Sequence, residues 1–251
     1  MVVITSFSKA LYEAYAHRVI ETFSNWPFEA TLIVYSEDIR EHVGPDSIEF
    51  RSLNFPDLLK FKAACQPTED YRYDAARFAN KVWAMVEGSM NESGLVFWLD
   101  ADCVTYRKPS AEFLKRLIPK SHYMGSFQRP SYVETGFWGV RANHEQHKPF
   151  MTALKDVYLS GKIFKLPQWH DCFALDHTRE AFTKAGLIQT TDLTKTLNGR
   201  GSHPIATSQL GKYICHLKGN RKSLGYSPEN PWRNGKTMAS TGLSSQTESS
   251  G

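Results

Sequence analysis

Short apolar runs and amphipathic stretches alternate through the first half of the sequence. Compact apolar runs are typical of buried strands, and apolar residues that recur every three or four positions are typical of helices. On this basis the sequence predicts strands at residues 2–7, 31–35, 48–53 and 95–99, and helices at residues 11–23, 74–87 and 112–117. A regular alternation of strand and helix favours a mainly parallel sheet covered by helices.

The pattern is less regular in the second half. It predicts strands at residues 122–127, 136–140 and 212–217, and helices at residues 147–159 and 171–182. Because strand and helix no longer alternate, we expect a mixed but mainly parallel, Rossmann-like sheet in an α/β fold. We predict a single domain over residues 1–226. Residues 227–251 would form a C-terminal extension, largely disordered from about residue 238, where Ser, Thr and Gly dominate.

The composition is that of an ordinary globular chain. Its 251 residues are 41% hydrophobic and 22% charged, and a domain of this size can fold without disulfides or a structural metal. The net charge of +4 and the pI of about 8.8 are mildly basic. Because the Lys and Arg residues are scattered among the acids, no nucleic-acid partner is expected, and the basic excess would suit a compact anion such as a diphosphate.

The cysteines and the apolar segments bear on the cellular compartment. The four cysteines form no CxxC pair and lack zinc-ligand spacing, which favours reduced thiols in a reducing compartment. No apolar stretch approaches the roughly 20 residues of a membrane span, and the first residues lack the features of a signal peptide. We therefore predict a cytoplasmic protein without a transmembrane segment, whose membrane contact would be peripheral.

The segment VFWLDADC places two carboxylates directly after the most apolar short run of the chain. In an open α/β sheet, ligands bind outside the carboxyl ends of the strands, where Asp100 and Asp102 are expected. Two carboxylates that converge repel each other unless a cation lies between them. Mg²⁺ and Mn²⁺ prefer oxygen ligands and can bridge phosphates. The alternative for such a pair is a solvated turn or a helix cap.

VFWLDADC resembles the D-x-D strand of GT-A glycosyltransferases. The resemblance implies that Asp100 and Asp102 hold a divalent ion on the diphosphate of a nucleotide sugar, and that Asp100 also faces the ribose or the sugar. The N-terminal VVITSFS is similar to the first GT-A strand, whose following loop holds the nucleoside. Thr5, Ser6 and Phe7 are then candidate nucleoside contacts, although hydroxyl residues are also ordinary at the end of a strand.

Two further segments fit the same order of motifs. In DAARFANKVWAM, Arg77 and Lys81 share a helix face, and similar enzymes use a basic residue there to approach the nucleotide and the acids. YVETGFWGVR resembles the strand that lines the acceptor side of the sugar pocket. Glu134 would offer hydrogen bonds to hydroxyls, and Gly136 would let a substrate approach the backbone. Trp138 is better explained as a core residue than as a sugar-stacking one.

The segment QWHDCFALD places Asp171 just before a predicted helix, where an Asp is often only an N-cap. Similar enzymes carry an acid here that contacts the donor sugar or acts near the reacting carbon. The glycogenin-like and galactosyltransferase-like families show a D-Q-D pattern at this place. This chain matches only its last acid, because Trp169 and His170 stand at the other two positions.

YICHLKGNRK resembles the late H-x-x-G-x-x-K pattern of glycogenin-like enzymes, in which the His is the third metal ligand. His216, Gly219 and Lys222 match that spacing, but the Pro and Trp of the family pattern do not follow directly. A neutral imidazole beside two carboxylates suits Mn²⁺ better than Mg²⁺. Lys218 and Lys222 would meet the diphosphate as fixed positive charges.

These motifs predict a metal-dependent glycosyltransferase that moves a sugar from a nucleotide-sugar donor to a hydroxyl acceptor. The pattern around His216 favours retention of configuration, whereas an inverting enzyme would need Asp171 or Glu134 as general base. Two alternatives stay open, a sugar-phosphate nucleotidyltransferase and a non-catalytic protein that binds nucleotide sugars or carbohydrates. The first usually carries a Gly-rich loop after its first strand, which is absent here. A pure binder has no need of a D-x-D with a late His.

Overall fold

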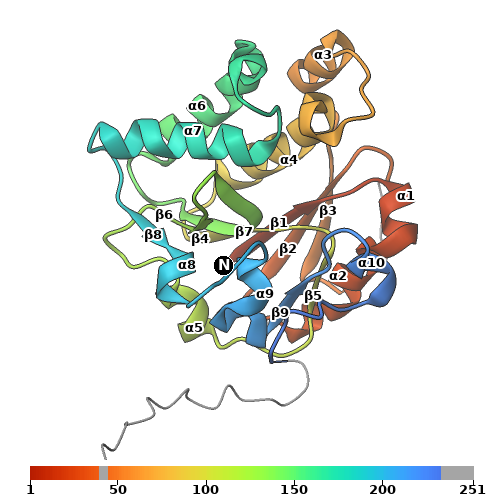
Figure 1. Ribbon diagram of the computed structural model, residues 1–251, viewed down its shortest axis with the longest axis vertical. Coiled ribbons are helices and arrows are strands. Elements are labelled where there is room, and N and C mark those ends of the chain that lie inside the picture. The colour runs from red at the N-terminus through yellow and green to blue at the C-terminus, as the bar shows by residue number, and fades with distance from the viewer. Residues whose placement is uncertain (40–44, 233–251) are drawn as a thin grey trace, which may run out of the picture.

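The computed structural model describes residues 1–39 and 45–232, and its centre is a seven-stranded sheet (Figure 1). The strands of this sheet are β1 (Val2–Ser6), β2 (Thr31–Ser36), β3 (Ile48–Ser52), β4 (Leu95–Leu99), β6 (Met124–Gln128), β7 (Val133–Arg141) and β8 (Thr190–Asp192). Their order is β3-β2-β1-β4-β7-β6-β8. β7 is antiparallel to both of its neighbours, and the other pairings are parallel. The predicted mixed, mainly parallel sheet is confirmed.

Helices cover both faces of this sheet (Figure 1). The longer ones gather on one face, namely α3 (Pro56–Ala64), α4 (Ala75–Ser89), α6 (His147–Leu159) and α7 (Asp171–Lys184). The shorter ones are α1 (Lys9–Leu11), α2 (His17–Thr22), α5 (Ala111–Arg116), α8 (Leu193–Thr196), α9 (Pro204–Thr207) and α10 (Arg221–Leu224). A π-helical turn, Tyr12–Ala16, joins α1 to α2, and 3₁₀ turns lie at Phe23–Asn25, Tyr71–Tyr73, Lys162–Lys165 and Gln209–Lys212.

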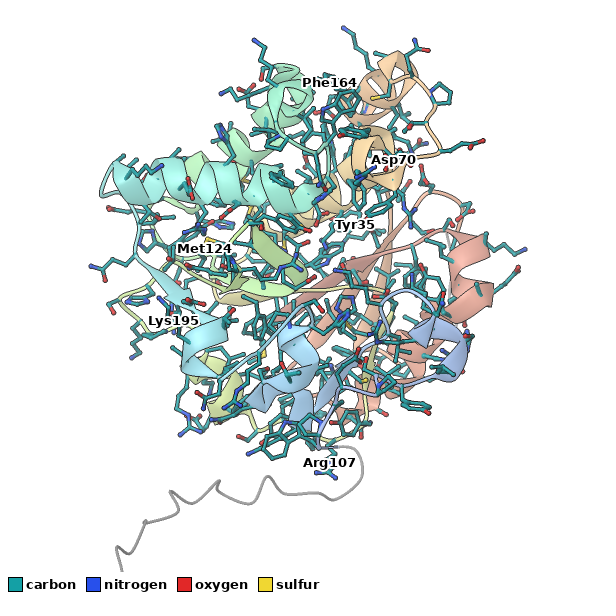
Figure 2. The ribbon with its side chains drawn as sticks, viewed as in Figure 1. Tyr35, Asp70, Arg107, Met124, Phe164 and Lys195 are labelled. Atoms are coloured by element: carbon teal, nitrogen blue, oxygen red, sulfur yellow. The ribbon has the colours of Figure 1, made fainter. Side chains whose placement is uncertain are left out.

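Two hydrophobic layers of side chains hold the helices to the sheet (Figure 2). Successive side chains of a strand point to opposite faces. In β1, Val3 packs into one layer and Ile4 into the other, and β2 repeats this with Leu32 and Ile33. The layer beneath α4, α6 and α7 contains Trp138, which is 3% exposed, so the prediction of a core tryptophan is correct.

The order of strands reverses between β1 and β4. β1, β2 and β3 follow one another toward one edge, and the chain then returns to place β4 on the other side of β1. Such a reversal opens a crevice at the carboxyl ends of the two strands, which is where open α/β sheets bind ligands. β1 ends at Ser6 and β4 ends at Leu99, so the acid pair follows directly at this crevice.

A separate two-stranded ribbon brings a late part of the chain to the same place. β5 (Cys103–Thr105) pairs antiparallel with β9 (Ile214–His216), and Cys103 lies opposite His216. Residues 227–232 then pack against the ribbon and its neighbours. The Ser227 hydroxyl donates to the carbonyl of His216 (2.6 Å), and Trp232 Nε1 donates to the carbonyl of Ser208 (2.9 Å).

The predicted elements are present with shifted ends. The predicted helix at residues 11–23 begins earlier, at Lys9, because the Ser8 hydroxyl accepts a hydrogen bond from the amide of Leu11 (3.4 Å) and caps the helix. The sequence pattern does not predict α3, β5 or β8. The predicted disorder from about residue 238 falls outside the described residues. Among the residues described, no helix has the length and apolar character needed to cross a membrane, and the four cysteines are free thiols.

Candidate active site

The acid pair lies in a tight turn after β4. The amide of Asp100 donates to the carbonyl of Gly136 on β7 (2.9 Å), and the amide of Cys103 donates to the carbonyl of Asp100 (2.9 Å). Ala101 between the acids is small and 9% exposed. These bonds fix the turn between two buried strands, so the carboxylates of Asp100 and Asp102 open into the crevice rather than into free solvent.

His216 at the end of β9 reaches the acid pair. Its Nε2 lies 3.1 Å from Asp102 Oδ1 and 3.6 Å from Asp100 Oδ2. The imidazole packs directly on Gly136, where a Cβ would come within 2.5 Å of His216 Cε1. We expected Gly136 to let a substrate approach the backbone, and this expectation is wrong because the space above Gly136 is filled by the imidazole.

These three residues fit a divalent cation. Ligand atoms around an ion such as Mg²⁺ lie about 2.1 Å from it, so neighbouring ligands of an octahedral site are about 3 Å apart. His216 Nε2 lies at this distance from Asp102 Oδ1 (3.1 Å) and somewhat farther from Asp100 Oδ2 (3.6 Å). Asp102 Oδ1 is buried and has no hydrogen bond of good geometry. Two carboxylates and one imidazole form a donor set that suits Mn²⁺. The predicted ligands Asp100, Asp102 and His216 are therefore brought together.

Lys81 from α4 bridges two carboxylates. Its Nζ lies 2.6 Å from Asp100 Oδ1 and 2.8 Å from Asp171 Oδ2, and it also donates to the carbonyl of Thr135 (2.7 Å). Trp98 Nε1 donates to the same oxygen of Asp100 (2.6 Å). Burial opposes the charged form of Lys81, but the two carboxylates outweigh it and raise its pKa above the usual range. Lys81 is therefore a fixed cation beside the acid pair.

Lys222 supplies the second cation at the acid pair. Its Nζ lies 3.2 Å from Asp102 Oδ2 and 4.3 Å from the centre of the Tyr15 ring. Burial acts to raise the pKa of Asp102, but His216 and Lys222 outweigh burial and lower it well below the usual range. The pKa of His216 is lowered by burial and raised more strongly by Asp102, so it lies above the ordinary value.

A second group of charges surrounds Glu134 on β7. The register between β6 and β7 shifts after Ser126, and this bulge leaves residues 135–137 without partners on β6. Glu134 and Thr135 at its start line the crevice. Glu134 is 3% exposed, and its Oε2 lies 3.1 Å from both Arg129 Nη1 and Lys218 Nζ. Burial acts to raise the pKa of Glu134, but the surrounding cations, including His216, lower it to about 2.

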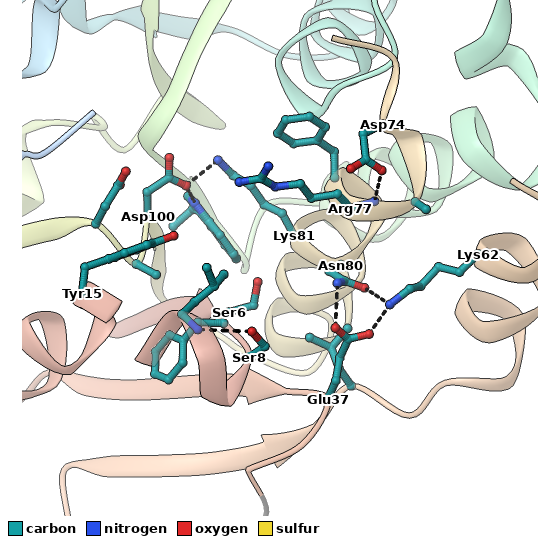
Figure 3. Close-up of a pocket in the computed structure, with 18 of the residues that line it drawn as sticks. Ser6, Ser8, Tyr15, Glu37, Lys62, Asp74, Arg77, Asn80, Lys81 and Asp100 are labelled. Atoms are coloured by element: carbon teal, nitrogen blue, oxygen red, sulfur yellow. Dashed lines mark hydrogen bonds and ion pairs between the residues drawn. The ribbon is translucent and has the colours of Figure 1, made fainter. Parts of the chain in front are cut away.

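The crevice has two connected parts. The larger, of about 570 Å³, extends from the acid pair along α4 to Glu37 and Lys62 (Figure 3). The smaller, of about 200 Å³, opens on the other side of the acid pair toward Glu134 and Asp171. Both parts share Lys81 and Lys222 in their walls, so a ligand in one part would meet a ligand in the other at the acid pair.

The predicted site residues lie in the walls of these two parts. Those in the wall of the larger part are Ser6, Phe7, Arg77, Lys81, Asp100, Asp102 and Lys222. Those in the wall of the smaller part include Glu134, Asp171, His216 and Lys218. Figure 3 shows Arg77 and Lys81 extending from α4 toward Asp100. Thr5 needs correction as a nucleoside contact, because its side chain is fully buried within β1 and does not line the crevice.

Several residues of the crevice were not expected from the sequence. Tyr15 and Glu37 line the larger part, and Arg129 lines the smaller part. Glu37 follows the carboxyl end of β2, a position from which it could have been predicted. Arg129 lies in the connection between β6 and β7 and belongs to no motif.

With this geometry established, known proteins provide a comparison. No protein-family model and no curated protein matches the sequence. Solved structures that resemble it include the galactosyltransferase LgtC in complex with donor and acceptor sugar analogues (TM-score 0.48, 14% identity, 70% of each chain covered). Another is mouse xyloside xylosyltransferase 1 (TM-score 0.48, 14% identity, 75% of this chain and 84% of that chain).

The glycosyltransferase GlyE of Streptococcus pneumoniae also resembles this structure (TM-score 0.47, 12% identity). The match covers 75% of this chain and 44% of GlyE. By their names these solved structures are glycosyltransferases. At these TM-scores and identities the chemistry has to be judged from the residues of the crevice.

Proposed function

We propose that this protein is a metal-dependent glycosyltransferase that uses a nucleotide-sugar donor and a hydroxyl acceptor. The observation that supports it most directly is the convergence of Asp100, Asp102 and His216 at the junction of two pockets. One pocket has room for a nucleoside diphosphate and the other adjoins it at the acid pair. A transferase needs this arrangement, because donor and acceptor have to meet at one point.

The cations nearest the acid pair would then have distinct roles. Asp100, Asp102 and His216 would hold a divalent ion, preferably Mn²⁺, which supplies Lewis-acid stabilisation of the departing diphosphate. Lys222, beside Asp102, is placed to contact the same phosphates. Lys81 holds Asp100 in one orientation through its short contact with Oδ1. Arg77, on the same helix face, lies in the wall of the larger pocket and extends toward Asp100, where it would approach the nucleotide.

The pairing of the remaining carboxylates bears on the stereochemistry. Asp171 is held by Lys81, and Glu134 is held by Arg129 and Lys218. A carboxylate in such an ion pair is a weak base, because its neighbours stabilise the ionised form. Neither therefore suits the removal of a proton from an acceptor hydroxyl. This supports a retaining transfer, in which the leaving phosphate can take that proton.

The first test is calorimetric titration of nucleoside diphosphates and nucleotide sugars with Mn²⁺ and then with EDTA. We expect binding that depends on the metal and that Asp102→Asn weakens by at least about tenfold, because the variant loses a charged ligand. Asp46→Asn, an exposed Asp outside the crevice, is the matched control and should bind like the wild type. Absence of nucleotide binding in Mn²⁺ would refute the proposed function.

Turnover distinguishes a transferase from a binder. A transferase hydrolyses its nucleotide sugar slowly when water replaces the acceptor, and the anomeric configuration of the released sugar, followed by NMR at early times, reports on retention or inversion. We expect the released sugar to keep the configuration of the donor. Binding without any turnover would favour the non-catalytic alternative.

A further inference from the structure

The charges along the crevice are paired unevenly. At the acid pair, two cations, Lys81 and Lys222, serve the three carboxylates of Asp100, Asp102 and Asp171. At the far side of the smaller pocket, two cations, Arg129 and Lys218, serve a single carboxylate. The first end therefore lacks positive charge, which a divalent cation would supply. The second end has a surplus of positive charge, which no described acidic group balances.

The geometry of the surplus end is specific. Arg129 Nη1 and Lys218 Nζ both contact Oε2 of Glu134, each at 3.1 Å, while Oε1 accepts from the amide of Gly136 (3.3 Å). Two cations on one carboxylate oxygen leave most of their donors unused, because a guanidinium has five N–H groups and an ammonium has three. Arg129 Nη2 is buried and has no hydrogen-bond acceptor in the described part of the structure.

Arg129 is held in place before any ligand arrives. Its guanidinium lies 4.4 Å from the centre of the Tyr132 ring, and Tyr132 packs on Phe173 with ring centres 4.7 Å apart. A guanidinium stacked on an aromatic ring keeps its in-plane donors available for an oxyanion. The side chain of Arg129 is 15% exposed and that of Lys218 is 44% exposed, so Lys218 lies on the side of the site that faces solvent.

This end adjoins the point where the sugar would react. Arg129, Lys218 and Tyr132 line the same pocket as Asp100 and Asp102. A group bound there would thus be part of the donor sugar or of the acceptor rather than of the nucleoside, which has the larger pocket. Within the proposed glycosyl transfer, on which this inference rests, we propose that Arg129 and Lys218 bind a carboxylate or phosphate group carried by the transferred or the accepting sugar.

The test compares acidic and neutral sugars without a nucleotide, so it does not depend on the proposed activity. Saturation-transfer NMR in Mg²⁺ would measure the binding of methyl β-glucuronide, glucose 6-phosphate and methyl β-glucoside to the full chain. We expect at least one acidic sugar to bind about tenfold more tightly than the neutral one, the effect of a charged hydrogen bond. Equal binding of all three, or no binding, would overturn the proposal.

Variants locate the effect. Lys218→Gln leaves Glu134 paired with Arg129 and should reduce the preference for the acidic sugar, while Arg129→Gln should abolish it. Arg116→Gln, on the exposed side of α5, removes one positive charge elsewhere and should preserve the preference. A preference that survives Lys218→Gln and Arg129→Gln would contradict the site.

A second arm identifies the source of the anion. Calorimetry with Mn²⁺ would compare UDP-glucuronate with UDP-glucose and GDP-mannuronate with GDP-mannose. A preference for the uronate that Lys218→Gln removes would place the acidic group on the donor. Equal donor binding together with the acidic preference of the free sugars would place it on the acceptor. If the pair bound the diphosphate instead, Lys218→Gln would weaken UDP and GDP themselves, and the proposal would be wrong.

Discussion

Gly136 shows how one residue decides the position of a ligand atom. The imidazole of His216 lies over its Cα, and a Cβ there would come within 2.5 Å of His216 Cε1 and 2.7 Å of Nδ1. Contacts this short force one partner to move. Because β7 is an interior strand of the sheet, its backbone is the more rigid partner, and the imidazole is the group that has to shift.

Gly136→Ala is therefore expected to weaken Mn²⁺-dependent nucleotide binding by about tenfold or more, since it moves one of three proposed ligands. Gly94→Ala is the matched control, because a Cβ at Gly94 meets nothing within 4 Å. Calorimetry of both variants checks the expectation. Unchanged binding in Gly136→Ala would mean that His216 does not hold the metal.

Lys81 is a second residue whose replacement should lower the free energy of unfolding. Lys81→Met would leave the carboxylates of Asp100 and Asp171 without their shared cation, and Asp171 is 4% exposed. Removing one partner of a buried ion pair costs about 3 kcal/mol or more. We expect a loss of this size in the free energy of unfolding, measured with urea. Adding Asp171→Asn should recover part of it, and additive losses would show that the two residues do not interact.

The sequence predicted the residues of the site as far as local patterns allow. Asp100 and Asp102 follow an apolar run, and the spacing from His216 to Lys222 forms a motif, so each could be found by inspection. Arg129 could not be found in this way. Its partner Glu134 is buried next to a register shift between β6 and β7, and no local sequence pattern predicts that shift. The contact between Gly136 and His216 joins two strands far apart in sequence, and for that reason the role of Gly136 was misjudged.

At the scale of elements, one buried histidine links the start of α6 to the end of α4. His147 begins α6, and its Nε2 donates to the carbonyl of Ser89 at the end of α4 (2.9 Å). Its Nδ1 then accepts from the hydroxyl of Tyr123 (3.1 Å). Burial lowers the pKa of His147 below its ordinary value. The folded protein therefore favours the neutral ring.

This histidine predicts a dependence of stability on pH. Because the folded state holds the proton of His147 less tightly than the unfolded state, its contribution is fully present above the unfolded pKa near 6.5 and is lost as the pH falls below it. Urea unfolding at pH 8 and pH 5.5 should show lower stability at pH 5.5. In His147→Gln the loss on acidification should be smaller, and an equal loss would assign the effect to other groups.

The sequence predicted those helices and strands whose hydrophobic pattern lies within the element itself. α6 has the predicted bounds, and β4 is a run of apolar residues. α3 was missed because apolar Leu59 lies on its exposed side, which obscures the helical spacing. β5 and β9 are three residues each, and they pair with each other and pack on a core formed by other elements. Their contact therefore depends on the whole fold.

At the scale of the whole molecule, residues 227–232 act as a clasp on the late half of the site. The Ser227 hydroxyl bonds to His216, Asn230 Nδ2 donates to the carbonyl of Gly211 (2.9 Å), and Trp232 Nε1 bonds to Ser208. Residues 227–232 thus pack against the domain that the sequence predicted to end at residue 226. The boundary itself stays a prediction.

Truncation tests the clasp. A chain ending at Tyr226 loses these three hydrogen bonds, each worth about 1 kcal/mol, together with the Arg221–Glu229 ion pair and the contact of Lys212 with the Trp232 ring. It should therefore lose at least about 3 kcal/mol of stability in urea. It should also bind Mn²⁺ with nucleotide more weakly, because the carbonyl of His216 is no longer held. A chain ending at Trp232 keeps every described contact and should match the full chain in both measurements. Equal stability of the two truncated chains would show that the clasp contributes nothing.

The ribbon of β5 and β9 has a thermodynamic consequence. It places Asp102 beside His216, two positions separated by nearly half of the chain. A divalent ion held by both would join them as a removable cross-link, closing a loop that is open in the unfolded chain. Because the unfolded chain presents no such site, binding and folding are linked, and the stability gained rises with the logarithm of metal concentration. The melting temperature would then follow metal occupancy before any sugar is transferred.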